Sequence, residues 1–324
     1  MKAVLCNQFG LPESLTFEDV AAPLPGKDDV LIQVKACGVN FPDTLMIQGK
    51  YQFKPPFPFS PGGEVAGIVT AVGDNVTHLK AGDRVFSLTG HGGFAEEVIG
   101  KASSTLPMLP DMDFVTAAST MYTYGTSYHA LNDRANLKPG ETLLVLGAAG
   151  GVGLAAVQLG RLLGARVIAA ASTDEKLAVC RELGANETIN YTRDDLRQQV
   201  KELTNGNGAD VVYDPVGDRY AEPGIRSLAW RGRYLVVGFA AGSIPSIPLN
   251  LALLKGASIV GVFWGAFAQR EPKASEANLR QILTWVESGQ LKQHIHRIYS
   301  LDETATALRA LVDRQVIGKA VVQI

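Results

Sequence analysis

The sequence predicts an α/β protein in which a doubly wound parallel sheet is joined to a small, irregular β-barrel. Between residues 125 and 265, apolar strand patterns alternate with helical patterns of about 10 to 15 residues. Over residues 1–124, short β patterns are separated instead by Gly, Pro and Asp. A glycine-rich stretch, LLVLGAAGGVGLAAVQLG at residues 143–160, lies near the start of the alternating part.

The glycine-rich stretch does not have the properties of a membrane span. A spanning helix needs about 20 apolar residues, and Arg161 ends this run. Its closely spaced glycines also disfavour a helix that would begin before them. The pattern predicts a buried strand in ETLLVLG, a tight turn in AAGGVG, and an apolar helix in GLAAVQLGRLLGA that ends at Gly164.

The same alternation continues along the chain. Strands are predicted in ARVIAAAS, ETINY, ADVVYDPVG, GRYLVVGFA and GASIVGVFWG. Helices are predicted in TDEKLAVCRELGA, TRDDLRQQVKELTNG and YAEPGIRSLAWRG. Such an order implies βαβ units and a parallel sheet that helices cover on both faces.

The residues on either side of this part have a different pattern. The first 124 residues hold short strands in MKAVLCN, DVLIQVKACGVN, GEVAGIVTAVG, DRVFSL and GGFAEEVIG. The end of the chain adds helices in KASEANLRQILTWVESGQL and DETATALRALVDRQ, then a strand in KAVVQI.

The composition excludes several classes of protein. Hydrophobic residues make up 46% and charged residues 19%, as in globular domains. A net charge of −2 gives no electrostatic footprint for nucleic acid or an anionic membrane. The three cysteines have no disulfide or zinc spacing, and the N-terminus is unlike a signal or transit peptide. We therefore expect a cytoplasmic protein that binds neither nucleic acid nor membrane.

The turn G-A-A-G-G-V-G is a variant of the dinucleotide-binding motif. It follows a strand and begins a helix, which is the context in which such a match has meaning. Backbone N–H groups of such a turn can approach a pyrophosphate at the helix N-terminus. An ordinary βα turn with helix-packing glycines remains the alternative. The cofactor-binding residues expected in this turn are Ala149, Gly150, Gly151, Val152 and Gly153.

The end of the next strand favours NADPH over NADH. An NAD site places an acidic residue there, whereas an NADP site needs room and positive charge. Here the strand ends in AAAST, and no acid precedes Asp174. Ser172, Lys176 and Tyr191 suit a 2′-phosphate. Lys176 as a merely solvated helix residue is the alternative.

The order of several motifs identifies a family resemblance. The segments are KACGVNFPD, GGEVAGIVTAVGDNV, GDRV, GGFAEE, LKPGETLLVLGAAGGVG, LGA and GRYLVVGFA. Over nearly its whole length, the chain resembles the zinc-free quinone oxidoreductase (zeta-crystallin-like) branch of the medium-chain dehydrogenase/reductase superfamily. The resemblance implies a GroES-like β-barrel catalytic domain, residues 1–124 and 266–324, and a Rossmann domain, residues 125–265, with the active site in the cleft between them.

The resemblance also implies that no catalytic metal is bound. The positions that match the zinc ligands of the alcohol dehydrogenases hold Asn40, Gly63 and Tyr122, and none of these is a usual zinc ligand. The family's structural zinc loop is absent as well, since no cysteine lies between Cys37 and Cys180.

By the same resemblance, three residues form the catalytic site. Asn40 and Thr126 lie beside the nicotinamide, and Tyr51 lines the substrate cleft, where Tyr51 or water could supply a proton. A turn-forming amide is the alternative for Asn40, and a packed aromatic ring is the alternative for Tyr51. Relatives often have a tyrosine where this chain has Leu45, which leaves the polarity of the pocket open.

Further cofactor contacts come from the family pattern. Val216 and Phe239 follow the fourth and fifth strands, Phe263 and Trp264 are candidates for covering the nicotinamide amide, and Arg314 matches an arginine that reaches the 2′-phosphate. Ordinary packing is the alternative for Phe263 and Trp264. Residues 244–262 match the segment that pairs edge to edge across the family's homodimer.

Together these features favour an NADPH-dependent quinone oxidoreductase that transfers hydride without a metal. Reduction of activated C=C bonds in enones, acrylates or enoyl thioesters would use the same machinery. Arg270 could meet an anionic substrate of that kind or only solvent. A different class remains, a crystallin-like nucleotide-binding or RNA-binding protein with little turnover. The nearly neutral charge disfavours RNA binding.

Overall fold

The computed structural model describes all residues, Met1–Ile324. The chain forms two compact units, Met1–Tyr122 with Gln293–Ile324, and Thr123–Lys292. The first unit therefore joins the two ends of the chain, and the second is inserted between them.

The first unit is built mainly from short strands. Its strands are β1 (Lys2–Leu5), β2 (Thr16–Asp19), β3 (Asp29–Val39), β4 (Glu64–Val72), β5 (Arg84–Leu88), β6 (Glu97–Lys101), β7 (Thr105–Pro107), β14 (Ile295–Ser300) and β15 (Lys319–Gln323). Its helices are η1 (Pro12–Ser14), α1 (Phe41–Met46), η2 (Ala102–Ser104), α2 (Phe114–Ala117), η5 (Leu301–Glu303) and α11 (Thr304–Val312).

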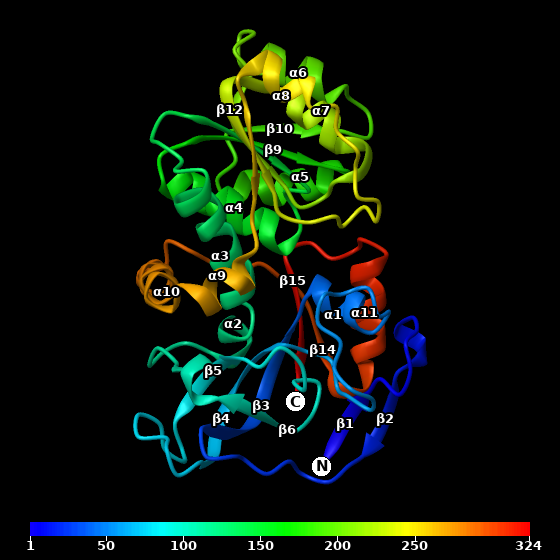
Figure 1. Ribbon diagram of the computed structural model, residues 1–324, viewed down its shortest axis with the longest axis vertical. Helices are drawn as coiled ribbons and strands as arrows, with labels where there is room; N and C mark the ends of the chain where they lie inside the picture. Colours follow the sequence, from blue (N-terminus) through cyan, green and yellow to red (C-terminus); the bar gives the residue numbers. More distant parts are fainter. The chain divides into compact units, whose positions relative to one another are not determined.

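A seven-stranded sheet organises this unit. Its order is β14-β15-β3-β4-β5-β7, and β6 pairs with β3 beside this path. The last strand of the chain, β15, lies antiparallel to β3, with Ala320 opposite Val39 (Figure 1). This pairing places residues from the end of the chain next to residues near position 40.

The second unit alternates strands and helices. Its strands are β8 (Thr142–Leu146), β9 (Arg166–Ala171), β10 (Glu187–Asn190), β11 (Ala209–Asp214), β12 (Leu228–Val236) and β13 (Ser258–Gly261). Its helices are α3 (Met121–Tyr128, whose first two residues belong to the first unit), η3 (His129–Arg134), α4 (Gly151–Leu162), α5 (Asp174–Glu182), α6 (Leu196–Leu203), η4 (Asp218–Tyr220), α7 (Ala221–Arg226), α8 (Asn250–Lys255), α9 (Trp264–Arg270) and α10 (Pro272–Glu287).

The predicted doubly wound parallel sheet is confirmed. All six strands are parallel, in the order β10-β9-β8-β11-β12-β13. The order reverses between β8 and β11, and ligands of such sheets bind at this point, beyond the carboxyl ends of the strands.

Helices pack on both faces of this sheet because its strands are apolar on both sides. On one face, Gly160 of α4 lies against the side chains of Leu143 and Val167. On the other, Gly224 of α7 lies against Leu146. Figure 1 shows α6, α7 and α8 gathered on this second side.

Two segments differ from their sequence-based description. The predicted helix at 220–232 ends at Arg226, because β12 already begins at Leu228 and pairs with β11. An irregularity in that pairing accommodates Arg231, which has a φ of +62°. The strand predicted at residues 256–265 is also shorter than expected. β13 ends at Gly261, and Trp264 begins the helix α9.

Residues 266–292 pack within the second compact unit, which ends at Lys292. Aromatic contacts hold them there, because Phe267 of α9 stacks on His129 at 3.9 Å between ring centres. Trp285 of α10 meets the ring of Tyr128 edge-on at 5.5 Å. None of the helices combines the length and the apolar character that crossing a lipid bilayer requires.

Candidate functional site

The glycine-rich turn joins β8 to α4 at the carboxyl end of the sheet. Gly147 has a φ of +57°, and a Cβ on Gly153 would lie 2.3 Å from the Gly147 carbonyl oxygen. A side chain is therefore excluded at Gly153 and strained at Gly147. Gly150 precedes α4 without a side-chain cap, and a Cβ there would meet only one atom within 4 Å. The turn thus leaves backbone N–H groups of a 12-residue helix open to an anion such as a pyrophosphate.

The loop after β11 packs against this turn. The carboxylate of Asp214, which is buried, accepts hydrogen bonds from the backbone N–H groups of Val216, at 2.7 Å, and Gly217, at 2.9 Å. Burial raises the pKa of Asp214, and a hydrogen bond from the Tyr234 hydroxyl opposes this shift. These bonds hold the loop in one conformation.

The loop brings two predicted cofactor residues to the turn. A Cβ on Gly147 would lie 2.6 Å from Cγ2 of Val216, so these two residues are in contact. In the same way, Gly217 lies against the ring of Phe239, which follows β12. The structure therefore gathers the glycine-rich turn, Val216 and Phe239 at one edge of the sheet.

The predicted 2′-phosphate residues lie at the ends of β9 and β10. Lys176 Nζ is 3.4 Å from Ser172 Oγ, and the Thr192 hydroxyl donates to the Ser172 carbonyl at 3.0 Å. Tyr191 is the first residue after β10, and its N–H donates to Ala171 at the end of β9. The structure thus brings Ser172, Lys176 and the segment that begins with Tyr191 together.

The acid nearest to this group is already bound. Asp174 accepts from the Asn190 side chain at 3.0 Å and pairs with Arg193 at 3.2 Å. The Asn190 hydrogen bond, followed by the Arg193 charge, holds the pKa of Asp174 below its usual value.

Thr126 lies in α3, beside the start of α4. The hydroxyl of the next residue, Ser127, donates to the Val152 carbonyl at 2.8 Å. On the other side, Gly125 lies against the ring of Trp264, since a Cβ there would be 2.5 Å from Cζ2. Phe263 is exposed. Thr126, Trp264 and the glycine-rich turn are therefore close neighbours.

Asn40 belongs to the first unit and lies in a buried hydrogen-bond network. Its Nδ2 donates to the Gly38 carbonyl at 3.2 Å and to Glu64 Oε2 at 2.9 Å, and its Oδ1 accepts from Lys319 Nζ at 2.6 Å. Lys319 also pairs with Glu64 Oε2 at 3.1 Å. Glu64 Oε1 accepts from the backbone N–H of Tyr122 at 2.9 Å. Every polar atom of the Asn40 side chain thus has a partner.

Asp43 adds a second buried carboxylate next to this network. It accepts backbone hydrogen bonds from Asn40, at 2.8 Å, and Gly62, at 3.3 Å. Burial raises the pKa of Asp43 to about 7, because these bonds and the Lys319 charge offset only part of the desolvation. Burial also raises the pKa of the neighbouring Cys37 thiol, as do Asp43 and Glu64, so this cysteine stays protonated.

Tyr51 is half-buried against the core of the first unit, and its side chain is hydrogen-bonded to Tyr122. Burial, together with the nearby Tyr51 and Asp43, raises the pKa of Tyr122 well above its usual value. Tyr51 thus packs against the apolar core, and its hydroxyl also has a polar partner.

Two of the three positions that match zinc ligands, Asn40 and Gly63, do not fit a zinc ion. The only possible ligand atom of Asn40, Oδ1, already accepts a hydrogen bond from a lysine ammonium. A Cβ on Gly63 would lie 2.8 Å from the carbonyl oxygen of Gly90, so no side chain can stand there unless the backbone moves. No group of three His, Cys, Asp or Glu side chains is placed to hold a metal ion.

The sequence analysis did not single out three residues that surround Asn40 in the structure. Glu64, Lys319 and Asp43 surround Asn40, but they lie as much as 279 residues apart and form no motif. The one available signal was the presence of Glu64 and Lys319 at the starts of otherwise apolar strand patterns. Arg314, the predicted 2′-phosphate ligand from the tail, follows α11 in the first unit and has a φ of +58°.

Two family models match the chain. An alcohol dehydrogenase GroES-like domain matches residues 26–111, and a zinc-binding dehydrogenase domain matches residues 151–280. A quinone oxidoreductase-like protein 2 homolog from Nematostella vectensis is 41% identical over 99% of this chain and 88% of its own length. The human quinone oxidoreductase is 37% identical over 95% of this chain and 92% of its own.

Solved structures agree with these relatives. The Escherichia coli quinone oxidoreductase, solved as a complex with NADPH, has a TM-score of 0.93 and 28% identity, with 100% of both chains covered. The CurK enoyl reductase has a TM-score of 0.89 and 25% identity, covering 99% of this chain and 98% of its own.

Proposed function

We propose that this chain, which belongs to the zinc-free quinone oxidoreductase branch of the medium-chain dehydrogenase/reductase superfamily, reduces quinones with NADPH and without a metal ion. One observation carries the proposal. Where a catalytic zinc would need ligands, the side chain of Asn40 is bound to Lys319 and Glu64. A lysine ammonium at this place repels a divalent cation, so the first unit lacks the Lewis acid that alcohol oxidation uses.

The residues of the second unit fit a dinucleotide. The open N–H groups at the start of α4 would hold the pyrophosphate, and Ser172, Lys176 and Tyr191 would hold a 2′-phosphate. Val216, Phe239, Thr126, Phe263 and Trp264 would contact the ribose and nicotinamide. NADPH, when bound, supplies a hydride from its dihydronicotinamide ring.

Quinone reduction consumes one hydride and one proton for each hydroquinone formed. Negative charge develops on a quinone oxygen, and a hydrogen-bond donor at that oxygen lowers the barrier. Tyr51 can donate its hydroxyl proton there or hold a water that does so. Both Nδ2 hydrogens of Asn40 already have acceptors. Asn40 therefore acts by positioning Lys319 and Glu64. It can donate to a substrate oxygen only if Nδ2 gives up one of its two present acceptors.

A second candidate within the same chemistry is reduction of a C=C bond conjugated to a carbonyl. The similarity to the CurK enoyl reductase favours it specifically. The hydride would then add to the β-carbon, and the donor at the carbonyl oxygen would stabilise the enolate. Enones, acrylates and enoyl thioesters belong to this class.

The proposal includes a homodimer joined through residues 244–262. Several apolar side chains in this segment are exposed in the single chain, namely Ile244, Leu249, Leu253, Leu254 and Ile259. β13 is the last strand of its sheet, and its free edge can pair with a second copy. Light scattering at micromolar concentration should give a dimer mass, and a monomer mass would contradict the proposal.

A cytoplasmic location also forms part of the proposal. Cys6, Cys37 and Cys180 are free and buried, which suits a reducing compartment. Cell fractionation that recovers the protein elsewhere would overturn this part.

The reaction is tested by following NADPH oxidation with a panel of acceptors. We expect 1,4-benzoquinone to be reduced fastest, and ethanol or benzyl alcohol with NADP⁺ to be inert. A larger rate with an enone or an acryloyl thioester would favour the second candidate. NADPH binding without turnover of any acceptor would instead support a nucleotide-binding protein of the crystallin type.

A further inference from the structure

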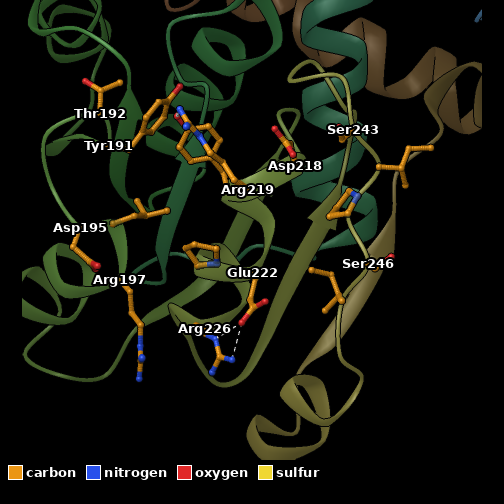
Figure 2. Close-up of a pocket in the computed structure, with 16 residues that line it drawn as sticks. Tyr191, Thr192, Asp195, Arg197, Asp218, Arg219, Glu222, Arg226, Ser243 and Ser246 are labelled. Atoms are coloured by element: carbon orange, nitrogen blue, oxygen red, sulfur yellow. Dashed lines mark hydrogen bonds and ion pairs between the residues drawn. The ribbon is translucent and has the colours of Figure 1, made fainter.

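A cavity of about 820 Å³ lies in the second unit, beyond the ends of β10 and β11. Figure 2 shows its walls, which come from the segment after β10, from η4 and α7, and from residues 243–247. None of the residues predicted to bind the cofactor except Tyr191 lines this cavity. The sequence motifs therefore do not explain what this cavity could bind.

An arginine and two aromatic rings form one wall. The Arg219 guanidinium lies 5.0 Å from the centre of the Tyr220 ring, and Nη2 donates to the Tyr220 hydroxyl at 3.0 Å. The ring of Tyr220 in turn contacts the ring of Tyr191, with 4.4 Å between their centres. Figure 2 shows the side chains of Tyr191 and Arg219 close together. Stacking and the hydrogen bond hold the exposed guanidinium in one place.

No salt bridge neutralises the charge of Arg219, although the carboxylate of the adjacent Asp218 acts on it. Arg226, in the same cavity, is paired with Glu222 at 2.7 Å, and Figure 2 shows this contact. The guanidinium of Arg197 points away from Arg219 in the same view. Arg219 forms no ion pair, and its side-chain hydrogen bond goes to the phenol of Tyr220. It is therefore the cation that the cavity offers to a ligand.

The backbone that carries Arg219 is strained. Gly217 adopts its φ of +68° freely, whereas the φ of +51° at Asp218 lies in the left-handed region that residues other than glycine uncommonly adopt. The buried Asp214 carboxylate holds the turn through the N–H of Gly217. Strain that the surrounding structure maintains in this way is typical of ligand-binding loops.

The cavity adjoins the place expected for the 2′ position of the cofactor ribose. In dinucleotide-binding sheets, a residue about 20 positions after the glycine-rich turn meets the 2′-hydroxyl, and a nearby arginine accommodates a 2′-phosphate. Ser172 holds that position here. Thr192, which lines the cavity next to Tyr191, donates to the carbonyl of Ser172.

We propose that Arg219, held in place by Tyr220, is a specificity-determining residue for the 2′-phosphate, and that the cavity receives the phosphorylated adenosine end of the cofactor. A guanidinium can donate two parallel hydrogen bonds to a phosphate. The aromatic wall offers a face against which the adenine can stack. This inference rests on the proposed use of NADPH.

The test uses ligands that lack the nicotinamide half, so that it does not depend on turnover. Calorimetric titration of the wild-type chain with adenosine 2′,5′-bisphosphate and with adenosine 5′-phosphate gives its preference for a 2′-phosphate. Arg219→Ala should reduce this preference by about tenfold. Arg219→Glu should abolish it, because the new carboxylate repels the phosphate. Arg226→Ala, which removes the same charge from the same cavity, should change it less than about twofold.

Retention of the preference in Arg219→Ala would overturn the inference, and so would an equal loss in Arg226→Ala. An absence of preference in the wild-type chain would also overturn it. Failure of the proposed function gives a different result, because it is measured as the absence of NADPH oxidation with every acceptor. If the wild-type chain reduces quinones and Arg219→Ala keeps the wild-type preference for a 2′-phosphate, this inference is refuted and the proposed function is not.

Discussion

The ammonium group of Lys319 lies 2.6 Å from the side-chain oxygen of Asn40, across 279 residues of sequence. Both side chains are buried, and Glu64 Oε2 completes the triangle at 3.1 Å from Lys319 and 2.9 Å from Asn40. The third partner of Lys319 is the Val39 carbonyl, at 3.2 Å. The pairing of β15 with β3 makes this arrangement possible.

Lys319→Met should destabilise the protein strongly, because it leaves the Glu64 carboxylate buried without a cation. Loss of one member of a buried pair costs about 3–5 kcal/mol. Urea unfolding followed by circular dichroism measures the change. Lys101→Ala, which removes an exposed pair with Asp29, is the control and should have little effect. A loss for Lys319→Met no larger than for the control would contradict the importance of the network.

Asn40→Ala should lower kcat/KM for quinone by roughly ten- to hundredfold, while the Kd for NADPH changes little. The variant removes one of the three acceptors of Lys319 and one donor to Glu64, so we expect the charged pair beside Tyr122 to shift. Steady-state kinetics and a fluorescence titration with NADPH separate the two quantities. Unchanged quinone kinetics would remove Asn40 from the mechanism but would not affect the assignment of the reaction.

Lys176→Ala should weaken NADPH binding by about 1–3 kcal/mol and leave NADH nearly unaffected. The ammonium lies 3.4 Å from Ser172 Oγ, where a 2′-phosphate is expected and a 2′-hydroxyl needs no cation. Titration with each cofactor gives the two Kd values, with Lys201→Ala on α6 as a control for net charge. Equal losses for NADPH and NADH would refute the assignment.

Purified protein should contain much less than one zinc ion per chain, and its activity should survive a chelator. Asn40 and Gly63 cannot act as ligands as they stand, for the reasons of hydrogen bonding and space given above. Elemental analysis checks the content directly. One zinc ion per chain would contradict the metal-free mechanism. Inactivation by the chelator that added zinc reverses would contradict it as well.

Asp43 should make the free energy of unfolding fall as the pH rises from about 4 to about 7. In this window the unfolded carboxyl has lost its proton, whereas the folded carboxyl, with a pKa of about 7, keeps it. The slope is at most about 1.4 kcal/mol per pH unit and vanishes above the folded pKa. Urea unfolding of wild type and Asp43→Asn at several pH values measures the difference. Parallel curves for the two proteins would show that Asp43 does not titrate in this way.

Local sequence was sufficient to predict the parallel sheet and the glycine-rich turn after β8. The strand and helix patterns of the second unit depend on apolar spacing within one element, and the turn depends on glycines at positions where a side chain would strain the backbone or clash with it. Such features are determined by neighbours in the chain. The prediction failed at Leu228, where pairing with β11 overrides a helical pattern.

Tertiary structure alone decided the surroundings of the predicted residues. Lys319 meets Asn40 because two distant strands pair, and Tyr220 contacts Tyr191 because a buried carboxylate shapes the turn after β11. Residues 266–292 join the second unit because their aromatic rings fit α3 and η3. The spacing of residues in the sequence does not predict such long-range contacts. Their free energy comes from burial and charge pairing, which exist only once the chain has folded.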